Sequence, residues 1–345
     1  MTALRYRLLD AALARGLLPD AVLRAGSVFG AWSRERAESR GGIVAQQARL
    51  DEIVERKSTG PVAEVPEAAN EQHYELPPEF LGLFLGPRRK YSGCLFESEA
   101  TTLAMAEEAM LALTCERAGI EDGQRILELG CGWGSLTLWL AEMYPNAEIV
   151  AVSNAHNQRE FIQGVAAEKG FQNLNVITQD MNDFEPEGKF DRVASVEMFE
   201  HMRNWKELLR RISSWLEPDG KLFVHVFSHR NLPYFFEDTW AAERFFTGGV
   251  MPSQDLMLNF QEDMAMEELW AVPGTHYART LQEWLKNLDA RRDEALAILR
   301  RDRRSEREAK ALLGSWRLFL LSTDKIWGYG GGNHWLVNHY VLKPR

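Results

Sequence analysis

Two acids and a histidine lie close together in the sequence, at a spacing that suits proton transfer. Glu197, Glu200 and His201 directly follow an apolar run. In a helix they would share one face, because residues three and four positions apart are neighbours. A carboxylate there could hold a protonated amine and remove its proton, which leaves a nucleophilic lone pair. The structural alternative makes Glu197 a cap or a surface charge and His201 an interior histidine. The functional interpretation is favoured, because the three occur together.

Residues 126–136 predict a loop that binds a ligand. They read as a strand that ends in glycines and turns directly into an apolar, helix-compatible stretch. Gly130, Gly132 and Gly134 remove the side chains from one side of the turn, so a ligand can lie against the backbone. The N-terminus of the following helix would offer free N–H groups to a carboxylate or a phosphate. Dinucleotide enzymes, methyltransferases and structural turns all contain such loops, so the loop alone does not identify the ligand.

Short apolar runs that alternate with helical stretches predict the scaffold that positions both groups. Alternation of this kind is typical of an α/β fold, with a mostly parallel sheet and helices on both faces. Residues 218–220, which include a proline and a glycine, are expected to form the turn into the fifth strand. The predicted strands are 125–129, 148–153, 174–178, 190–196 and 221–227.

Polar residues follow the predicted strands at the points where the strands end. Because ligands of such sheets bind at the carboxyl ends of the strands, we expect these residues to converge with the glycine loop. His225 lies within the fifth strand itself. The others are Ser153, Asn154, Gln158, Gln179, Asp180, Asn182 and His229, with Met181 among them.

Helices are expected to surround this sheet. Residues 4–23 carry apolar side chains at helical spacing, and we favour packing on the protein itself over binding to a membrane surface. A second helix is predicted at 43–57 and a proline-rich linker at 57–78. A further helix is predicted at 100–118.

The stretch 232–260 is rich in aromatic residues. It predicts a hydrophobic lid over the active edge of the sheet, the core of a helical subdomain, or both. The charged stretch 290–310 predicts a solvated helix face, with a phospholipid headgroup site as the alternative. A helix near 312–326, a glycine-rich turn at 328–332 and a strand at 335–342 follow. The aromatic residues are Tyr234, Phe235, Phe236, Trp240, Phe245, Phe246 and Phe260.

Composition argues against several classes of function. The chain has 345 residues, with 40 Lys and Arg against 50 Asp and Glu and a formal charge of -10. A protein that neutralises phosphates would normally be basic, so nucleic acid is not expected as a partner. The three cysteines lack metal-ligand spacing and predict neither disulfides nor a metal site. No apolar run reaches the roughly 18 residues of a membrane span, and no signal-peptide pattern is present. We expect a cytoplasmic enzyme, with peripheral membrane contact and oligomeric state left open.

The glycine spacing separates two kinds of ligand. A dinucleotide site would need G-x-G-x-x-G and an acidic residue about 20 positions later. Here the glycines alternate, and the second strand ends in Ser153 and Asn154. This spacing, with Glu128 just before the loop, resembles motif I of class I methyltransferases that use S-adenosylmethionine. The resemblance implies that the methionine end lies on the loop. It places the adenosine near Ser153, Asn154, Gln158, Asp180 and Met181, although Asp180 could instead cap a helix.

Four motifs define a narrower resemblance, which covers the chain from about Lys90 onward. Together they resemble the cyclopropane fatty acid synthase superfamily, and within it the coclaurine N-methyltransferase-like enzymes most of all. Shorter matches at 115–118, 223–225 and 276–278 extend the likeness. The motifs are Tyr-Ser-Gly-Cys at 91–94, Leu-Gly-Cys-Gly-Trp-Gly at 129–134, Val-Glu-Met-Phe-Glu-His-Met at 196–202 and Gly-Gly-Val-Met-Pro-Ser at 248–253.

This resemblance implies roles for individual residues. Glu200 and His201 match the catalytic pair of the amine methyltransferases, with Glu197 as a contributor. Tyr91 and Ser92 are implied to hold the methionine end of the cofactor. In the cyclopropane synthases, the positions of Glu200 and His225 help to hold a bicarbonate that acts as a base.

Two departures from the cyclopropane synthases favour an amine acceptor. Those enzymes have a cysteine directly after the Tyr-Ser pair, where this chain has Gly93. They also have a tyrosine near the C-terminal helix, whereas this chain has Trp316 and Phe319 around that position.

We therefore predict an S-adenosylmethionine-dependent methyltransferase that N-methylates a hydrophobic amine, with an aromatic or cyclic amine as one option. The alternatives are transfer to an unsaturated lipid acyl chain and a binding protein without catalytic activity. The expected organisation is a helical extension and linker at 1–90 and a methyltransferase domain at 91–345, with a helical, aromatic cap at about 230–310.

Overall fold

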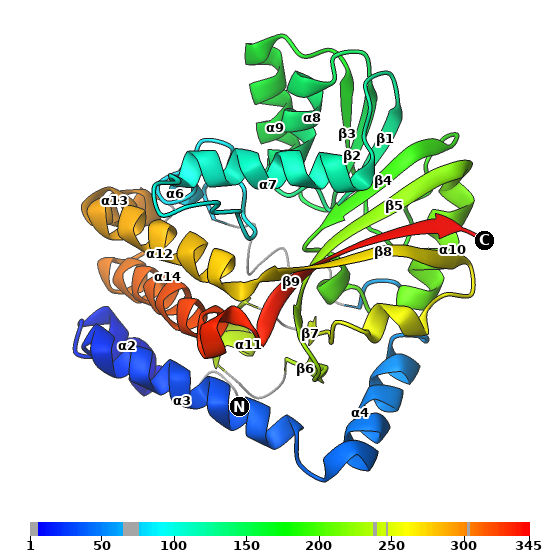
Figure 1. Cartoon of the computed structure of the whole chain (residues 1–345). Helices are drawn as coiled ribbons and strands as arrows, with labels where there is room; N and C mark the ends of the chain where they lie inside the picture. Colours follow the sequence, from blue (N-terminus) through cyan, green and yellow to red (C-terminus); the bar gives the residue numbers. More distant parts are fainter. Residues whose placement is uncertain (1–5, 65–75, 237–239, 246–247, 302–303) are drawn as a thin grey trace.

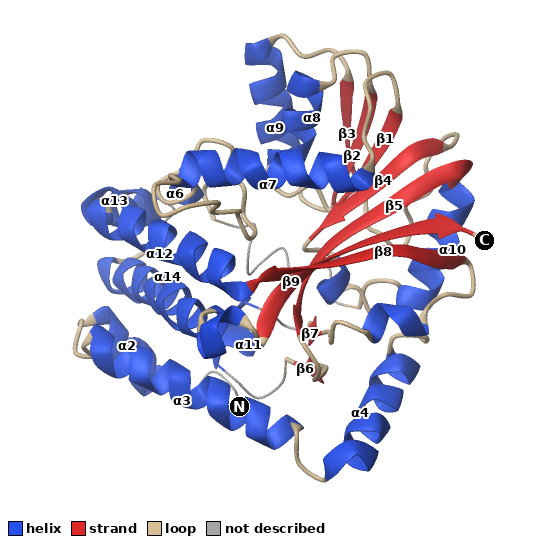
Figure 2. Ribbon diagram, in the orientation of Figure 1, coloured by secondary structure: helices blue, strands red, loops and turns tan. Residues whose placement is uncertain are grey.

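A seven-stranded sheet forms the centre of the computed structural model, which describes residues 6–64, 76–236, 240–245, 248–301 and 304–345. The strand order is β3-β2-β1-β4-β5-β9-β8 (Figure 2). β1 to β5 run parallel, and β9 is antiparallel to both β5 and β8. The predicted α/β class with a mostly parallel sheet is confirmed. The strands are β1 (Arg125–Leu129), β2 (Glu148–Ser153), β3 (Leu174–Thr178), β4 (Phe190–Val196), β5 (Leu216–His229), β8 (Met264–Pro273) and β9 (Trp335–Pro344).

Successive residues of the central strands pack on opposite faces of this sheet. Ile126 and Phe223 belong to one apolar cluster, and their neighbours Leu127 and Val224 belong to another. Both faces are therefore covered, as predicted. One face carries α7 (Leu103–Ala118), α8 (Ser135–Met143) and α9 (His156–Lys169), and the other carries α4 (Gly42–Arg56) and α10 (Trp205–Trp215).

The first four strands have the predicted bounds, whereas the later part of the sheet departs from prediction. The turn expected at 218–220 lies inside β5, where pairing with β4 passes from Leu216 to Lys221. β8 was not predicted. Glu267 and Glu268 lie in its middle, and the pairing with β9 is irregular there, so the alternation that marks a strand is lost.

Three helices connect β8 to β9 and lie together beside the sheet (Figure 1). They are α12 (Gly274–Ala290), α13 (Arg292–Arg301) and α14 (Glu306–Trp327), here called the cap helices. The cap expected at 230–310 is thus not purely helical, because β8 falls within it, and its helices continue to Trp327. The expected domain boundary near residue 90 stays a prediction. Short elements complete the fold: α6 (Pro78–Leu81), η2 (Phe199–His201), β6 (Tyr234–Phe235), α11 (Trp240–Phe245), β7 (Val250–Met251), η3 (Leu256–Asn259) and η4 (Tyr329–Gly332).

The N-terminal helices α2 (Arg7–Ala14) and α3 (Asp20–Glu38) pack against α14 (Figure 1). The single helix predicted over 4–23 is therefore wrong within the described residues. Gly16 has a φ of 64° and Pro19 is the N-cap of α3, so the chain turns between the two helices. The packing agrees with the interpretation that these helices cover the protein itself. Among the described residues, no helix has both the length and the apolar composition to cross a membrane.

Ion pairs fasten α3 to the cap helices. Arg24 Nη1 lies 2.6 Å from Asp324 Oδ2, and Arg317 Nη1 lies 2.7 Å from Asp20 Oδ1. Arg317 also pairs with Asp289 of α12, with 2.7 Å between Nε and Oδ1. α3 is thus held in a fixed position. Half of the linker expected at 57–78, namely residues 65–75, lies outside the described residues.

Gly134 predicts a measurable packing effect. Its φ is 78°, and an added Cβ would lie 2.5 Å from Cγ1 of Ile162. Gly170 has a similar φ of 74°, but an added Cβ would meet no atom within 4 Å. We expect Gly170→Ala to lower the free energy of unfolding by about 1–2 kcal/mol, the cost of the left-handed backbone. Gly134→Ala should lower the free energy of unfolding by roughly 1–3 kcal/mol more than this, because the added Cβ overpacks against Ile162. Urea denaturation measures both, and equal losses would contradict the proposed contact.

Candidate active site

A cavity of about 830 Å³ lies at the carboxyl ends of β1 and β4. Its volume is within the roughly 300–1,000 Å³ of small-molecule sites. Gly130 follows β1 and Glu197 follows β4, and both line the cavity, so the expected convergence is confirmed for these two segments. Other walls come from α3, α12 and α14. No signal in the sequence predicted that α3 would line the site.

The aromatic stretch contributes to the cavity only in part. Tyr234, Phe236 and Trp240 line it, as a lid would. Phe245 packs on Phe319 instead, with 4.4 Å between ring centroids. The lid and core interpretations therefore each apply to some of these residues. Phe235 and Phe260 pack in the apolar cluster beside α10, and Phe246 lies outside the described residues.

The glycine loop presents an open backbone to this cavity. The N–H groups of Gly130 and Cys131 donate to the carbonyl of Val152, at 3.0 and 2.9 Å, which fastens the loop to β2. Gly132 has a φ of 51°, and an added Cβ would meet no atom within 4 Å. Nearby, Trp133 Nε1 and Ser135 Oγ are buried without a hydrogen-bond partner in the described part of the chain. These atoms and the bare backbone suit a polar ligand.

Three groups contact the carboxylate of Glu197. Its Oε1 accepts from the backbone N–H of Gly93 at 3.2 Å and lies 3.3 Å from Nε2 of His225. Its Oε2 accepts from the hydroxyl of Tyr277 at 2.8 Å. The backbone of Glu197 has a φ of 50°, which is rare for a residue with a side chain and typical of functional sites. These contacts and the strained backbone thus fix the orientation of this carboxylate.

The predicted helical arrangement of the acids is wrong. Only 199–201 form a short 3-10 helix, and Glu197 precedes it in a left-handed conformation. Glu197, Glu200 and His201 therefore do not share one α-helical face. All three nevertheless line the cavity, so the structure brings the predicted acid–base residues together by another route.

Burial determines the electrostatics of both acids. Burial raises the pKa of Glu197 to about 7, against the charge of Lys90 and the Tyr277 hydrogen bond, which lower it. Glu200 is completely buried, and neither carboxylate oxygen has a hydrogen-bond partner among the described residues. Its pKa is raised well above the usual value, first by burial and then by the charge of Glu197.

Two buried lysines complete the site, and the sequence analysis missed both. Lys90 Nζ donates to Ser92 Oγ and, at 2.9 Å, to the carbonyl of Gly93. Lys57, at the end of α4, donates to the carbonyl of Met202. Burial lowers the pKa of Lys57 to about 7, while the nearby charge of Glu200 raises it. A lone lysine gives no sequence signal, although Lys90 directly precedes the Tyr-Ser motif.

Five predicted cofactor residues line the cavity, namely Tyr91, Ser92, Glu128, Gly130 and Gly132. Tyr91 stacks on Trp284, with 5.7 Å between ring centroids. Glu128 is buried and accepts from Thr137 Oγ1 at 2.5 Å. Burial raises the pKa of Glu128 to about 8.

The other predicted cofactor residues lie outside the lining, at the ends of β2 and β3. Ser153 Oγ contacts Gln158 Oε1 at 2.5 Å, and Gln158 Nε2 is buried without a partner in the described chain. Asp180 Oδ1 accepts from the N–H of Asn182 at 2.7 Å within a turn, and no helix begins there, so the helix-cap alternative is wrong. A cofactor role for these residues stays a prediction, as it does for Asn154, Met181 and Gly134.

Gly93 and Tyr277 form a coupled pair. A Cβ added at Gly93 would lie 3.3 Å from Cδ1 of Tyr277, closer than ordinary van der Waals contact. The glycine therefore leaves room for the tyrosine ring that donates to Glu197. Tyr277 was missed as a site residue, although it lies in the quoted His-Tyr-Ala match at 276–278.

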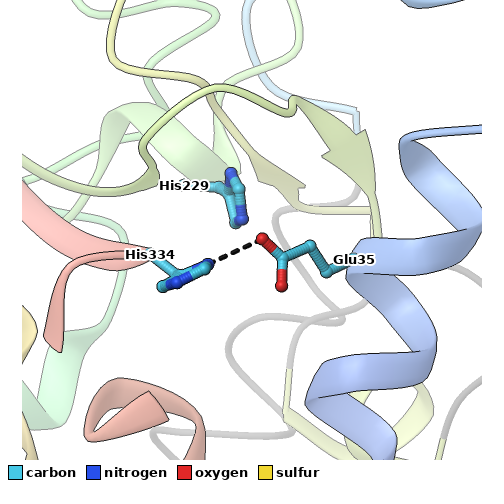
Figure 3. Close-up of side chains that lie close together, drawn as sticks. All are labelled: Glu35, His229 and His334. Atoms are coloured by element: carbon cyan, nitrogen blue, oxygen red, sulfur yellow. Dashed lines mark hydrogen bonds and ion pairs between the residues drawn. The ribbon is translucent and has the colours of Figure 1, made fainter. Parts of the chain in front are cut away.

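A second cluster joins α3 to the ends of β5 and β9. Glu35, His229 and His334 offer ligand atoms that lie within 4.8 Å of one another (Figure 3). His334 Nδ1 lies 2.6 Å from Glu35 Oε1. However, Nδ1 of His229 accepts from the N–H groups of Asn231 and Leu232, at 3.1 and 3.0 Å. The proton of this neutral ring is therefore on Nε2, which has no lone pair for a metal. The cluster acts as an attachment of α3.

Comparison with known proteins agrees with this geometry. A family model described as mycolic acid cyclopropane synthetase matches residues 63–327. An (S)-coclaurine N-methyltransferase from Thalictrum flavum subsp. glaucum is 38% identical over 291 residues, which cover 82% of this chain and 81% of that protein. The cyclopropane-fatty-acyl-phospholipid synthase of Escherichia coli K12 is 29% identical over 215 residues, 62% of this chain and 54% of that protein. A crystal structure of coclaurine N-methyltransferase with N-methylheliamine and SAH has a TM-score of 0.93 at 35% identity, covering 97% and 98% of the two chains.

Gly132 provides a test of the loop. We expect Gly132→Val to weaken binding of S-adenosylmethionine, the ligand expected from the sequence, by at least about tenfold, or about 1.4 kcal/mol. The reason is that the new side chain would fill the open space over the backbone. Gly123→Ala is the control, because its φ of 88° is also left-handed and its added Cβ also meets no atom within 4 Å. Isothermal titration calorimetry measures both, and unchanged affinity in Gly132→Val would make the loop purely structural.

Proposed function

This chain belongs to the mycolic acid cyclopropane synthetase family and is an S-adenosylmethionine-dependent methyltransferase, and from this premise we propose that it N-methylates a hydrophobic, cyclic secondary amine. The predicted superfamily, enzyme class and cofactor are confirmed. The amine comes from the names of the relatives, which methylate nitrogen in coclaurine and related compounds. A cytoplasmic location is also our proposal, supported by three cysteines that are all free.

The residues of the cavity fit the cofactor. Gly132 leaves the loop backbone bare, and Trp133 Nε1 and Ser135 Oγ are buried polar atoms that await a partner in the described chain. Tyr91, Ser92 and these residues would hold the methionine end. When bound, S-adenosylmethionine supplies an electrophilic methyl group. The protein must then align the acceptor and manage its proton.

Glu200 is the observation that carries the amine proposal. It is a fully buried carboxylate without a hydrogen-bond partner among the described residues, in a cavity with aromatic walls. A buried carboxylate without a partner is costly, and a protonated amine would satisfy it. The rings of Tyr91 and Trp284 stack on each other in the same lining and offer apolar contact and π faces to a cation.

The same groups can remove the proton of the amine. Only a neutral amine has a lone pair, so the ammonium must lose its proton before methyl transfer. Glu197, with a pKa raised to about 7, is able to exchange protons near neutral pH. Glu200 holds the cation beside it, and His201 lines the same space. Aromatic side chains in the lining reduce the contact of water with the transfer.

The structure gives less support to an acyl-chain acceptor. In this chain the ring of Tyr277 lies against Gly93 and donates to Glu197. The Cβ of a cysteine at position 93, which the sequence resemblance implies for the synthases, would lie 3.3 Å from Cδ1 of that ring. The synthase relative also matches a smaller part of the chain, 62% against 82% for the N-methyltransferase.

A labelled-methyl assay tests the acceptor class. The protein is incubated with methyl-labelled S-adenosylmethionine and either a panel of 1,2,3,4-tetrahydroisoquinolines or vesicles of unsaturated phospholipid. We expect label in the amines alone, with greater turnover for amines that carry an aromatic substituent, since the walls are aromatic. Label in the lipid alone would replace the proposal with acyl-chain transfer.

Glu200→Gln tests the carboxylate directly. Because the amide cannot take a proton or balance a cation, we expect kcat to fall by about 10²–10⁴-fold, with little change in cofactor affinity. Glu267→Gln is the matched control, because Glu267 pairs with Lys221 and Lys343, away from the cavity lining. Steady-state kinetics and calorimetry supply the two readouts. Wild-type turnover in Glu200→Gln would remove Glu200 from the mechanism.

A further inference from the structure

Four side chains form a continuous line of hydrogen bonds that ends at the carboxylate of Glu197. Arg117 Nη1 lies 2.8 Å from His339 Nδ1. His339 Nε2 lies 2.9 Å from His225 Nδ1, and His225 Nε2 lies 3.3 Å from Glu197 Oε1. The two histidines face each other across the β5–β9 pair, in register. Arg117 comes from the last turn of α7. The line thus runs from a helix, through the sheet, to the active site.

This line has only one possible direction while Arg117 is present. A guanidinium carries donors and no acceptor, and it does not lose its proton in proteins. His339 must therefore accept at Nδ1, and its single proton is on Nε2. That proton is donated to Nδ1 of His225, so the proton of His225 is on Nε2 and points at Glu197. Each tautomer is fixed by the one before it.

Both imidazoles are neutral in this environment. His225 and His339 are completely buried within the sheet. Burial is the largest cause that lowers the pKa of each ring well below the usual value, and the charges of Arg117 and Lys90 act in the same direction. A neutral imidazole carries one proton, so a donor on one side requires an acceptor on the other.

We propose that Arg117 and His339 are positioning residues that fix the tautomer of His225, so that Glu197 receives a hydrogen bond and remains available as a proton acceptor. Without Arg117 the line could reverse. Glu197 would then be protonated and donate to His225, which would donate to His339. A reversed line keeps the proton on Glu197 and opposes its role as a base. This inference rests on the proposed function, since it concerns removal of the proton of the amine.

Other charged groups also affect the pKa of Glu197, and the direction of the hydrogen-bond line does not alter them. Lys90 favours the ionised form, Glu200 opposes it, and Tyr277 donates a hydrogen bond. The charge of Glu116, which is exposed, acts on Arg117 and raises its pKa. A test must therefore separate the direction of the line from a simple change of charge.

Arg117→Glu reverses the line, because a carboxylate at that position accepts from Nδ1 of His339. Arg117→Lys keeps a donor there. His339→Phe breaks the line without changing the charge. Arg192→Glu is the matched control, since Arg192 Nε donates to the carbonyl of Gly119, two residues beyond Arg117, but takes no part in the line.

The first readout is the tautomer of each histidine, from ¹⁵N chemical shifts of protein labelled in its histidines, without substrate. We expect protonated Nε2 in both rings of the wild type, of Arg117→Lys and of Arg192→Glu, and protonated Nδ1 in Arg117→Glu. Protonated Nδ1 at His225 in the wild type would overturn the proposal. This readout needs no activity, so it remains valid if the protein fails to methylate any amine and the proposed function is wrong.

The second readout is the pH profile of kcat/KM with an accepted amine. A base must be ionised, so activity falls as the pH drops through the pKa of Glu197. Loss of the hydrogen bond raises that pKa, and we expect the acid limb to move up by about one pH unit in Arg117→Glu. The shift should be smaller in His339→Phe, where Nε2 of His225 can still donate to Glu197 but its tautomer is no longer fixed. Their plateau at high pH should approach that of the wild type. A uniform loss at every pH, or an unmoved acid limb, would mean that the line is only structural.

Discussion

Two buried carboxylates determine the arrangement of this site. Glu197 and Glu200 lie three residues apart and both line the cavity, where burial and mutual repulsion oppose ionisation. Buried cations and hydrogen-bond donors offset part of this cost. Lys90 and Lys57 are themselves costly to bury, and their charges are balanced by these acids. Within this group, Glu200 favours the charged form of Lys57, and Lys90 favours the charged form of Glu197.

Much of the fold could be predicted from the sequence because local patterns determine it. The glycine loop and the bounds of β1 to β4 follow from alternation of apolar runs with helices. β8 could not be predicted, because Glu267 and Glu268 interrupt its pattern and pairing with β9 supplies what its own residues do not. The break between α2 and α3 could be read from Gly16 and Pro19, but the apolar periodicity of residues 4–23 favoured one helix.

The candidate site, too, contains residues that the sequence could predict and residues that it could not. Glu200 and His201 could be predicted from a short motif, whereas the left-handed backbone of Glu197 could not, because it depends on contacts from distant segments. Tyr277 and Arg117 both lie within sequence matches that support the family resemblance, but a match gives no partner. His339 gave no signal until β9 was paired with β5. Residues that act through others are visible only after the chain has folded.

The position of β9 also constrains how this protein reaches its folded state. β9 lies between β5 and β8, yet it follows β8 in the sequence after the whole of the cap helices. β8 consequently has no sheet partner until residues 335–344 insert beside β5. That pairing joins β8 to the rest of the sheet and brings His339 beside His225. Assembly of the catalytic machinery therefore depends on contacts between segments that are far apart in the sequence.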